Sequence, residues 1–546
     1  MINFIKRRKR KIMWRRVSSA FEPLGFYSSG VVSPSPSLRG RRGAWESVIG
    51  LEIHAQISSE TKLFSSGRTP QGGYQSPVNT CASFFDAALP GTLPILNQRC
   101  VEAGIQTALA LGCTLNLISN FDRKHYFYAD LPSGYQITQS RLPLAVDGSV
   151  AYWVIHPDLK PFKTVAPIIQ LQLEMDSGKS LHDDQDKQSL IDLNRCGVGL
   201  MEIVFGPSLS GGEEAVSLVK ELSSIMTKIG SCSCKMEEGA LRVDANISVH
   251  RPGTQLGTRT EVKNLNSTKA LYHAIEYEVE RQINILESGG SVINETLGFD
   301  SENRKTISMR EKESKLDYRF MPEPNLLPLK LKDSLVEREC SHANNDFLDV
   351  DYFRKNLPPL PEELRKDLIE QYGIDISIIN FVINEPVIYK YYAESLKYGV
   401  ENVKVLISIL TTSIQELLKK GHNLEEDSSL TPEILASIAN AKYNKTYSYQ
   451  ALNKSLTYYL ENQNLFIPLK DLIERNGWDN RDEDPLLDKI MDEILSDNYK
   501  KVQKYLNGKD KEWKGIIFNI RKKYKDHESL DAIIEGVQRK LTEQRK

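Results

Sequence analysis

The sequence predicts an α+β protein in which a large, mainly antiparallel sheet domain comes first and helices follow. Strand-like runs alternate with glycine-rich turns from Trp45 to about Asn325. Amphipathic helical patterns replace them after Asn325. The chain has 546 residues, which is more than one hydrophobic core usually supports, so we expect several domains.

The predicted strands of the first domain carry apolar residues at every second position. They cover residues 47–57, 166–176, 199–205, 240–250 and 258–265. Two helices are predicted among them, at 99–111 and 268–286, the second because apolar residues recur there at helical spacing. This mixture of strands and helices is typical of an α+β domain.

Proline and glycine delimit the helices of the second half. Pro361 stands where one helix begins, and Gly373 lies just past its end. A polar break, "GHNLEEDSS", precedes Thr431 and Pro432, which can cap and open the next helix. We therefore predict a catalytic domain at 46–340, a helical domain at 341–425 and a helical tail domain at 426–546.

The last fifty residues carry an excess of positive charge. Residues 497–546 hold fourteen Lys or Arg and eight Asp or Glu, and the aromatic residues among them are Tyr499, Tyr505, Trp513, Phe518 and Tyr524. Cations bind phosphates and aromatic rings stack on unpaired bases, so this segment is a candidate RNA-binding surface. The alternative is a solvated helix face with aromatic residues in the core.

The first 45 residues differ from the rest of the chain in charge. They contain eleven basic residues and one acidic residue, Glu22, together with several serines and aromatic residues. This composition is typical of a mitochondrial transit peptide, although "KRRKRK" also fits a nuclear-import or RNA-binding cluster. No apolar run has the ~18 residues of a membrane span. The seven cysteines are sparse and odd in number, which argues against a secreted disulfide framework.

Four of the predicted regions have one strongly polar face. The residues that alternate onto those faces are Glu52 and His54, then Gln170, Gln172, Glu174 and Asp176, then Arg242, Asp244 and Asn246, and finally Glu261 and Lys263. One such strand is ordinary for a solvated sheet. Several together predict a cleft where carboxylates hold Mg²⁺ and cations neutralise phosphate oxygens, as phosphoryl transfer requires.

Six blocks of the sequence resemble a known family. They are "VIGLEIHAQISSETKLFS", "FDRKHYFYADLPSGYQITQ", "SLIDLNRCGVGLMEIV", "KMEEGALRVDANISVH", "GTRTEVKNLNS" with "AIEYEVERQ", and "DYRFMPEPNLLPL". In order and spacing they are similar to the B subunits of glutamyl-tRNA(Gln) amidotransferases, from about residue 46 to the C-terminus.

The resemblance implies a fold and a reaction. The fold is a cradle-like catalytic domain related to glutamine synthetase, followed by a helical domain and a tail that binds tRNA. The reaction is the ATP-dependent conversion of Glu-tRNA(Gln) to Gln-tRNA(Gln), with phosphorylation of the γ-carboxylate before ammonia attacks. The sequence does not separate this substrate from Asp-tRNA(Asn).

The resemblance also implies partners and a location. The chain shows no amidase-type Ser-Ser-Lys apparatus, so the glutaminase (amidase) subunit of the amidotransferase would supply the ammonia, and a small third subunit would complete a heterotrimer in the mitochondrial matrix. The alternative is a non-catalytic RNA-binding or assembly protein that retains the fold.

Candidate site residues follow from the resemblance. The predicted metal ligands are Glu52, His54, Glu174 and Glu202. The candidates for binding the acceptor end or ATP are Lys124, Tyr126, Tyr128 and Tyr135. The predicted catalytic and phosphate-binding residues are Arg242, Asp244, Asn246 and Lys263.

Two positions depart from the family pattern. The family often has Glu-Glu-Asp where this chain has "EMD", and Met175 cannot bind Mg²⁺. Many members have a four-cysteine zinc site after the first block, whereas residues 64–85 retain Cys81 alone, so we expect no structural zinc. His54 raises a separate question, because an imidazole suits Mn²⁺ or Zn²⁺ better than Mg²⁺. It contacts either the metal or a phosphate.

Overall fold

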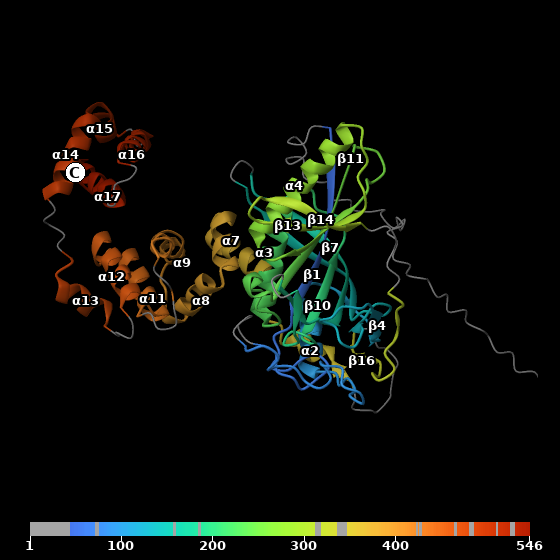
Figure 1. Cartoon of the computed structure of the whole chain (residues 1–546). Coiled ribbons are helices and arrows are strands. Elements are labelled where there is room, and N and C mark those ends of the chain that lie inside the picture. Colours follow the sequence, from blue (N-terminus) through green and yellow to red (C-terminus); the bar gives the residue numbers. More distant parts are fainter. Residues whose placement is uncertain are drawn as a thin grey trace, which may run out of the picture. The chain divides into compact units, whose positions relative to one another are not determined.

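A computed structural model describes the chain between residues 44 and 545. The undescribed residues within these limits are 71–75, 157–159, 184–186, 312–317, 336–346, 422–423, 425–428, 463–466, 480–484, 509–510 and 525–529. Most of the predicted transit peptide lies outside the described residues. The chain divides into two compact units, Met1–Leu364 and Arg365–Lys546 (Figure 1).

A nine-stranded sheet forms the centre of the first unit. Its strands are, in spatial order, β14 (Lys305–Glu311), β13 (Glu295–Asp300), β12 (Thr260–Leu265), β11 (Leu241–His250), β1 (Glu46–Gln56), β10 (Gly199–Phe205), β7 (Phe162–Met175), β6 (Ala145–Val154) and β2 (Thr114–Leu115). Neighbouring strands are antiparallel except β12 and β13, which are parallel. All five predicted strands belong to this sheet, so the prediction of a mainly antiparallel sheet is confirmed.

Helices cover one face of the sheet (Figure 1). They are α2 (Gln98–Ala110), α3 (Gly212–Ile229) and α4 (Thr268–Glu287), which contact β7, β6 and β11 respectively. The apolar residues of the strands, such as Leu51 and Ile53, are buried in one core with residues of these helices. Because successive side chains of a strand point to opposite faces, the polar residues between them lie on the other face. The two predicted helices are confirmed.

Three small sheets complete the strands described in this unit. They are β15 (Met321–Pro322) with β4 (Asp122–His125) and β5 (Tyr135–Thr138), β17 (Leu348–Asp349) with β16 (Leu329–Lys332) and β3 (Ile118–Ser119), and β8 (Lys179–Asp183) with β9 (Gln188–Asp192). Strand β5 contacts β7, which brings the first small sheet to the large one. Strand β17 and helix α5 (Val350–Lys355) contact β16, and the proposed division at residue 340 stays a prediction.

The described part of the second unit is helical. Helix α6 (Pro361–Tyr372) crosses the division between the units, and the helices after it are α7 (Ile376–Asn384), α8 (Pro386–Ser395), α9 (Val403–Ser408), α10 (Gln415–Lys419), α11 (Pro432–Tyr443), α12 (Tyr449–Glu461) and α13 (Leu469–Asn476). The predicted caps are confirmed. Thr431 Oγ1 accepts a hydrogen bond from the Ile434 amide at 3.2 Å, and Gly373 ends α6 with a φ of +58°.

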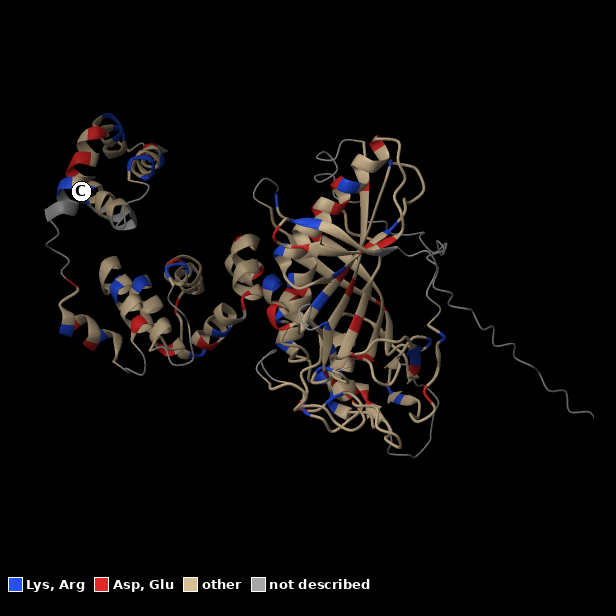
Figure 2. Cartoon of the chain, viewed as in Figure 1, with Lys and Arg blue, Asp and Glu red and all other residues tan. Residues whose placement is uncertain are grey.

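Four helices at the C-terminus share a small core of their own. They are α14 (Pro485–Asp497), α15 (Tyr499–Leu506), α16 (Lys511–Lys523) and α17 (Leu530–Arg545). Figure 2 shows Lys and Arg on α15 and α16. Tyr505, Trp513 and Tyr524 pack against the core, whereas Tyr499 and Phe518 are exposed. RNA binding here stays a prediction. None of the described helices is both long and apolar enough to span a bilayer.

Candidate functional site

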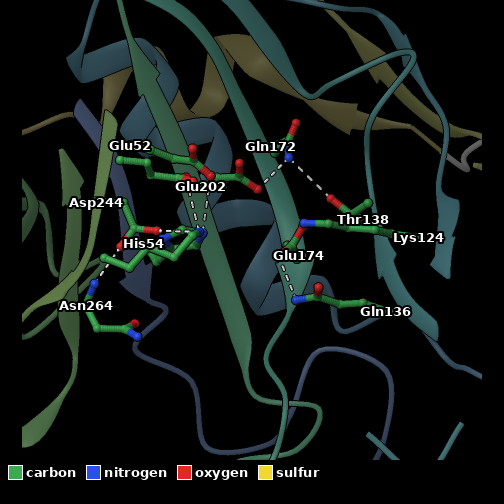
Figure 3. Close-up of polar contacts among 12 residues, drawn as sticks. Glu52, His54, Lys124, Gln136, Thr138, Gln172, Glu174, Glu202, Asp244 and Asn264 are labelled. Carbon is green, nitrogen blue, oxygen red and sulfur yellow. Dashed lines mark hydrogen bonds and ion pairs between the residues drawn. The ribbon is translucent and has the colours of Figure 1, made fainter. Parts of the chain in front are cut away.

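The register of the central strands places three predicted metal ligands together on the polar face of the sheet. His54 on β1 lies directly opposite Glu202 on β10, and Glu52 is two residues before His54 on the same strand face. One ligand atom from each residue lies within 4.8 Å of the other two. Figure 3 shows the three side chains converging. This spacing is close enough for all three residues to bind one ion.

The electrostatics of this group favour a cation. Glu202 is buried, and its pKa is raised well above the ordinary value by that burial and by the nearby carboxylates of Glu174 and Glu52. A divalent ion between these oxygens would offset the repulsion. The donor set of two carboxylates and one imidazole fits a divalent metal, and the imidazole suits Mn²⁺ or Zn²⁺ better than Mg²⁺.

Gln172 on β7 holds the buried carboxylate of Glu202 in place. Its Nε2 donates to Glu202 Oε2 at 2.6 Å, and its Oε1 accepts from Gln170 Nε2 at 2.7 Å. Both glutamines were predicted on the polar face, with no role assigned to either. The sequence placed them on that face because polar and apolar residues alternate along β7, so that Gln170, Gln172 and Glu174 point to one side.

Glu174 lies apart from the three-residue group. Its Oε1 accepts a hydrogen bond from Gln136 Nε2 at 2.6 Å, and its buried Oε2 accepts none from any described residue. That oxygen is 3.9 Å from Lys124 Nζ. Burial lowers the pKa of Lys124, but the charges of Glu174 and Glu202 outweigh it and raise this pKa overall. Lys124 therefore stays an ammonium group beside the candidate metal ligands (Figure 3).

Of the three predicted tyrosines, Tyr126 lies beside Lys124, and Tyr128 packs against Tyr126. The Tyr126 hydroxyl donates to Gln136 Oε1 at 2.8 Å, and its ring centroid is 5.6 Å from that of Tyr128. Tyr318, which was not among the predicted residues, has its ring centroid 6.3 Å from that of Tyr126 and 5.3 Å from Lys124 Nζ. Tyr318 belongs to the sixth sequence block, "DYRFMPEPNLLPL", to which no site residue was assigned, because its proximity to Lys124 depends on tertiary packing.

Tyr135 has different partners. It precedes Gln136 on β5, so its side chain points to the opposite face of that strand. Its ring centroid lies 4.2 Å from the guanidinium carbon of Arg123, whose Nε donates to Glu323 at 2.6 Å. The structure thus brings Tyr126 and Tyr128 together but places Tyr135 in another cluster.

The predicted phosphate-binding residues lie on β11 and β12. Asp244 is directly opposite Glu52, and Arg242 is directly opposite His54. Arg242 Nη2 donates to Asp176 Oδ2 at 2.7 Å, while its buried Nε contacts no hydrogen-bond acceptor among the described residues. The pKa of Arg242 is raised, because Asp176 and neighbouring acids outweigh the effect of burial.

Lys263 on β12 forms ion pairs with two carboxylates, those of Asp244 and Glu261. Its Nζ is 3.1 Å from Asp244 Oδ2 and 3.2 Å from Glu261 Oε1, and these charges raise its pKa although burial lowers it. Asn246 lies opposite Gly50. It is two residues after Asp244 on β11, so its side chain points to the same face as that of Asp244. Its buried Oδ1 has no hydrogen-bond partner within the described chain.

The position of Met175 shows why the sequence "EMD" is compatible with the polar cleft. It follows Glu174 on β7, so its side chain points to the opposite face, where it is buried in the hydrophobic core. The methionine therefore occupies no position in the polar cleft.

Comparisons with known proteins identify the family. Residues 47–337 match the family model described as the GatB/GatE catalytic domain, and residues 390–541 match the one described as a GatB domain. The chain belongs to the GatB family. The family assignment made from the six sequence blocks is thus confirmed.

Relatives in this family carry consistent names. The B subunit of the mitochondrial glutamyl-tRNA(Gln) amidotransferase of Aedes aegypti is 45% identical over 87% of this chain and 89% of the relative. The human protein of the same name is 49% identical over 74% of this chain and 73% of its own length. The B subunit of the aspartyl/glutamyl-tRNA(Asn/Gln) amidotransferase of Rickettsia typhi is 39% identical over 89% and 96%. These names support the amidotransferase prediction and not the non-catalytic alternative.

Proposed function

We propose that this chain is the subunit of a mitochondrial amidotransferase that converts Glu-tRNA(Gln) to Gln-tRNA(Gln) with ATP and glutamine-derived ammonia. The observation that carries the proposal is the meeting of Glu52, His54 and Glu202 on a polar sheet face that also holds Arg242, with Lys124 approaching from a small neighbouring sheet. Phosphoryl-transfer enzymes use such groups: metal ligands hold the ion that neutralises phosphate charge, and fixed cations bind the phosphate oxygens.

The chemistry begins with a poor electrophile. The γ-carboxylate of the tRNA-bound glutamate is negatively charged, and oxide is a poor leaving group, so phosphorylation must precede attack by ammonia. When bound, Mg²⁺ held by Glu52, His54 and Glu202 would neutralise phosphate charge and orient the transferred group. Lys124 and Arg242 would bind phosphate oxygens as charge develops on them.

The cations of the site are held in position before the substrate arrives. Lys124, Arg242 and Lys263 each lie within 4 Å of a buried carboxylate. Each therefore keeps both its charge and its orientation, and less conformational entropy is lost when ATP binds. Tyr126, next to Lys124, and Tyr128, which packs on Tyr126, would offer apolar ring faces for the adenine of ATP or of the tRNA acceptor end.

The remaining assignments of the proposal concern the surroundings of the site. The polar-faced sheet would form the cradle of a glutamine synthetase-like domain within residues 46–340, and 341–425 would join it to the tail domain. The basic helices of 426–546 would bind the tRNA body. The amidase subunit would release ammonia from glutamine, and a small third subunit would complete a complex in the mitochondrial matrix.

Glutamine substitutions of the candidate metal ligands test this function. Glu52→Gln and Glu202→Gln in the reconstituted complex should each lower ATP-dependent amidation of Glu-tRNA(Gln) at least about 100-fold. Binding of the tRNA, measured by filter retention, should not change, because neither side chain lies in the tail. Glu237→Gln, at an exposed position of the same unit, is the matched control. Full activity in both site variants would refute the metal assignment.

A further inference from the structure

A pair of cysteines lies in the segment that joins α3 to β11. Cys232 and Cys234 are separated by Ser233 alone, within the sequence "GSCSCK". Cys232 is buried, whereas Cys234 is partly exposed to solvent. Two residues so close in sequence have Cα atoms within about 7 Å of each other, and a disulfide spans roughly 4.4–6.8 Å between Cα atoms. The spacing therefore allows the two sulfurs to bond.

The backbone of this segment turns the two side chains toward each other. Cys234 has a φ of +56°, a left-handed conformation that is rare for residues other than glycine. With this turn the Cys234 amide donates to Cys232 Sγ at 3.2 Å, and Cys234 Sγ lies 3.8 Å from the Cys232 carbonyl oxygen. A strained backbone that brings two reactive groups together points to a functional role.

Hydrogen bonds to the chain around the end of β1 fix both ends of the segment. The Ser58 amide donates to the Ser231 carbonyl at 2.8 Å, and the Gln56 amide donates to the Ala240 carbonyl at 2.8 Å. The Cys232 thiol donates to that same Ala240 carbonyl at 3.5 Å. The fold thus holds the two sulfurs near each other, which makes a reaction between them much faster than one between separate thiols.

The surroundings of the pair favour the thiolate of Cys234. A hydrogen bond from the Cys232 thiol lowers the pKa of Cys234, although burial opposes this effect. The hydroxyls of Ser223 and Thr227 on α3 lower it further. The hydrogen bond between the cysteines, together with burial, raises the pKa of Cys232. Because the thiolate is the reactive form of cysteine, Cys234 is the attacking sulfur and Cys232 stays a thiol.

The other described cysteines lack this combination of features. Burial raises the pKa of Cys100 to about 11 and those of Cys113 and Cys196 to about 12, so these thiols stay protonated. Cys81 is partly exposed, but the cysteine nearest to it in the sequence is the buried Cys100. Oxidation should therefore be selective for the pair of Cys232 and Cys234.

We propose that Cys232 and Cys234 form a reversible disulfide when hydrogen peroxide oxidises Cys234. In the first step the Cys234 thiolate attacks one peroxide oxygen, so that an S–O bond forms and the O–O bond breaks. The leaving hydroxide takes a proton and becomes water, the peroxide gains the two electrons that the sulfur loses, and Cys234 becomes a sulfenic acid.

In the second step the two sulfurs join. The Cys232 sulfur attacks the sulfenic sulfur of Cys234, the S–O bond breaks as the S–S bond forms, and hydroxide leaves with the Cys232 proton as water. A disulfide across one intervening residue closes a small, strained ring, and strained disulfides are the most easily reduced. A thiol reductant should therefore restore both cysteines. This modification is separate from the amidation reaction and does not depend on it.

Mass spectrometry of the assembled complex tests the proposal. The complex is treated briefly with hydrogen peroxide and then with iodoacetamide, which alkylates the thiols that remain. Trypsin cleaves after Lys228 and Lys235, so the peptide 229–235 contains both cysteines and no other. This peptide should be unalkylated and lighter by one pair of hydrogen atoms, and dithiothreitol should restore both alkylation sites. Oxidation of Cys81 should be at least about tenfold slower.

Substitutions separate the two steps. Cys232→Ser and Cys232→Ala remove the second thiol, so oxidation should stop at a Cys234 sulfenic acid, which dimedone labels. Cys234→Ser should leave Cys232 reduced. Cys81→Ser is the matched control at the other partly exposed cysteine, and it should leave oxidation of the peptide 229–235 unchanged.

Three results would overturn the proposal. The first is a peptide 229–235 that keeps both thiols in the unmodified complex while Cys81 is oxidised. The second is dimedone labelling of Cys232 in Cys234→Ser as fast as that of Cys234 in Cys232→Ser. The third is a disulfide that forms only after the chain is unfolded in urea, because the folded segment would then not bring the sulfurs together.

Discussion

Replacing Gln172 by leucine should weaken metal binding without unfolding the protein. Gln172 is buried, and its Nε2 donates to Glu202 Oε2 at 2.6 Å. Leucine removes this donor and keeps most of the side-chain volume. A hydrogen bond to a charged group contributes about 1.5–3 kcal/mol, and losing a residue that orients a metal ligand costs roughly 10- to 100-fold in metal affinity.

Direct metal titration measures this effect. Mn²⁺ titrated into the assembled complex and counted by electron paramagnetic resonance should give a Kd roughly 10- to 100-fold higher for Gln172→Leu. The KM for Mg²⁺ in amidation should rise in parallel, while kcat at saturating Mg²⁺ changes less. This split distinguishes a residue that positions Glu202 from one that acts on the substrate.

Gln170→Leu is the matched control for the same strand. Gln170 Nε2 donates to Gln172 Oε1 at 2.7 Å, so it acts on Glu202 only through Gln172. Its substitution should raise the Kd for Mn²⁺ by less, about threefold. If Gln172→Leu binds Mn²⁺ as tightly as the unmodified chain while its thermal unfolding is unchanged, the assignment of Glu202 as a ligand held by Gln172 is wrong.

Three other substitutions have defined outcomes. Burial and neighbouring carboxylates raise the pKa of Glu202 in the folded protein. Its contribution to stability is therefore full below the ordinary carboxyl pKa and is lost as pH rises through the raised pKa. Glu202→Gln, measured by calorimetry in the presence of a chelator, should raise Tm more at pH 8 than at pH 5. Lys62→Met leaves Asp86 buried without its cation and should cost about 3–5 kcal/mol in urea unfolding. Tyr126→Phe removes the hydroxyl bonded to Gln136 and should lower kcat/KM by up to about tenfold, by steady-state amidation kinetics.

The strands of the sheet could be predicted because alternation is a local property of the sequence. In β1, Leu51 and Ile53 are buried in the core while Glu52 and His54 face the cleft, as the period of two requires. The same rule explains Met175, whose side chain points into the core because Glu174 points into the cleft. Local spacing was therefore sufficient to sort side chains between the two faces.

The partners across the cleft could not be derived from spacing. The register that sets His54 opposite Glu202 depends on how β1 and β10 pack, and resemblance alone had grouped them. Glu174 shared the face of Glu202, yet Gln136 and Lys124 approach it from a separate small sheet. Contacts of this kind depend on tertiary packing, which no single stretch of sequence encodes.

The charges of the cleft locate a cation site without reference to any relative. Glu174 has Lys124 nearby, Asp176 has Arg242, and Asp244 has Lys263. Among the described residues, Glu52 and Glu202 have no Lys or Arg nitrogen within 4 Å, and Lys124 and Lys263 act on them from farther away. Repulsion from Glu174 and Glu52, together with burial, still raises the pKa of Glu202. Burying a charge without compensation is costly, so a site that retains these acids needs a bound ion to be stable in its ionised form. The place where close positive charge is lacking coincides with the group of Glu52, His54 and Glu202, whose ligand atoms lie within 4.8 Å of one another.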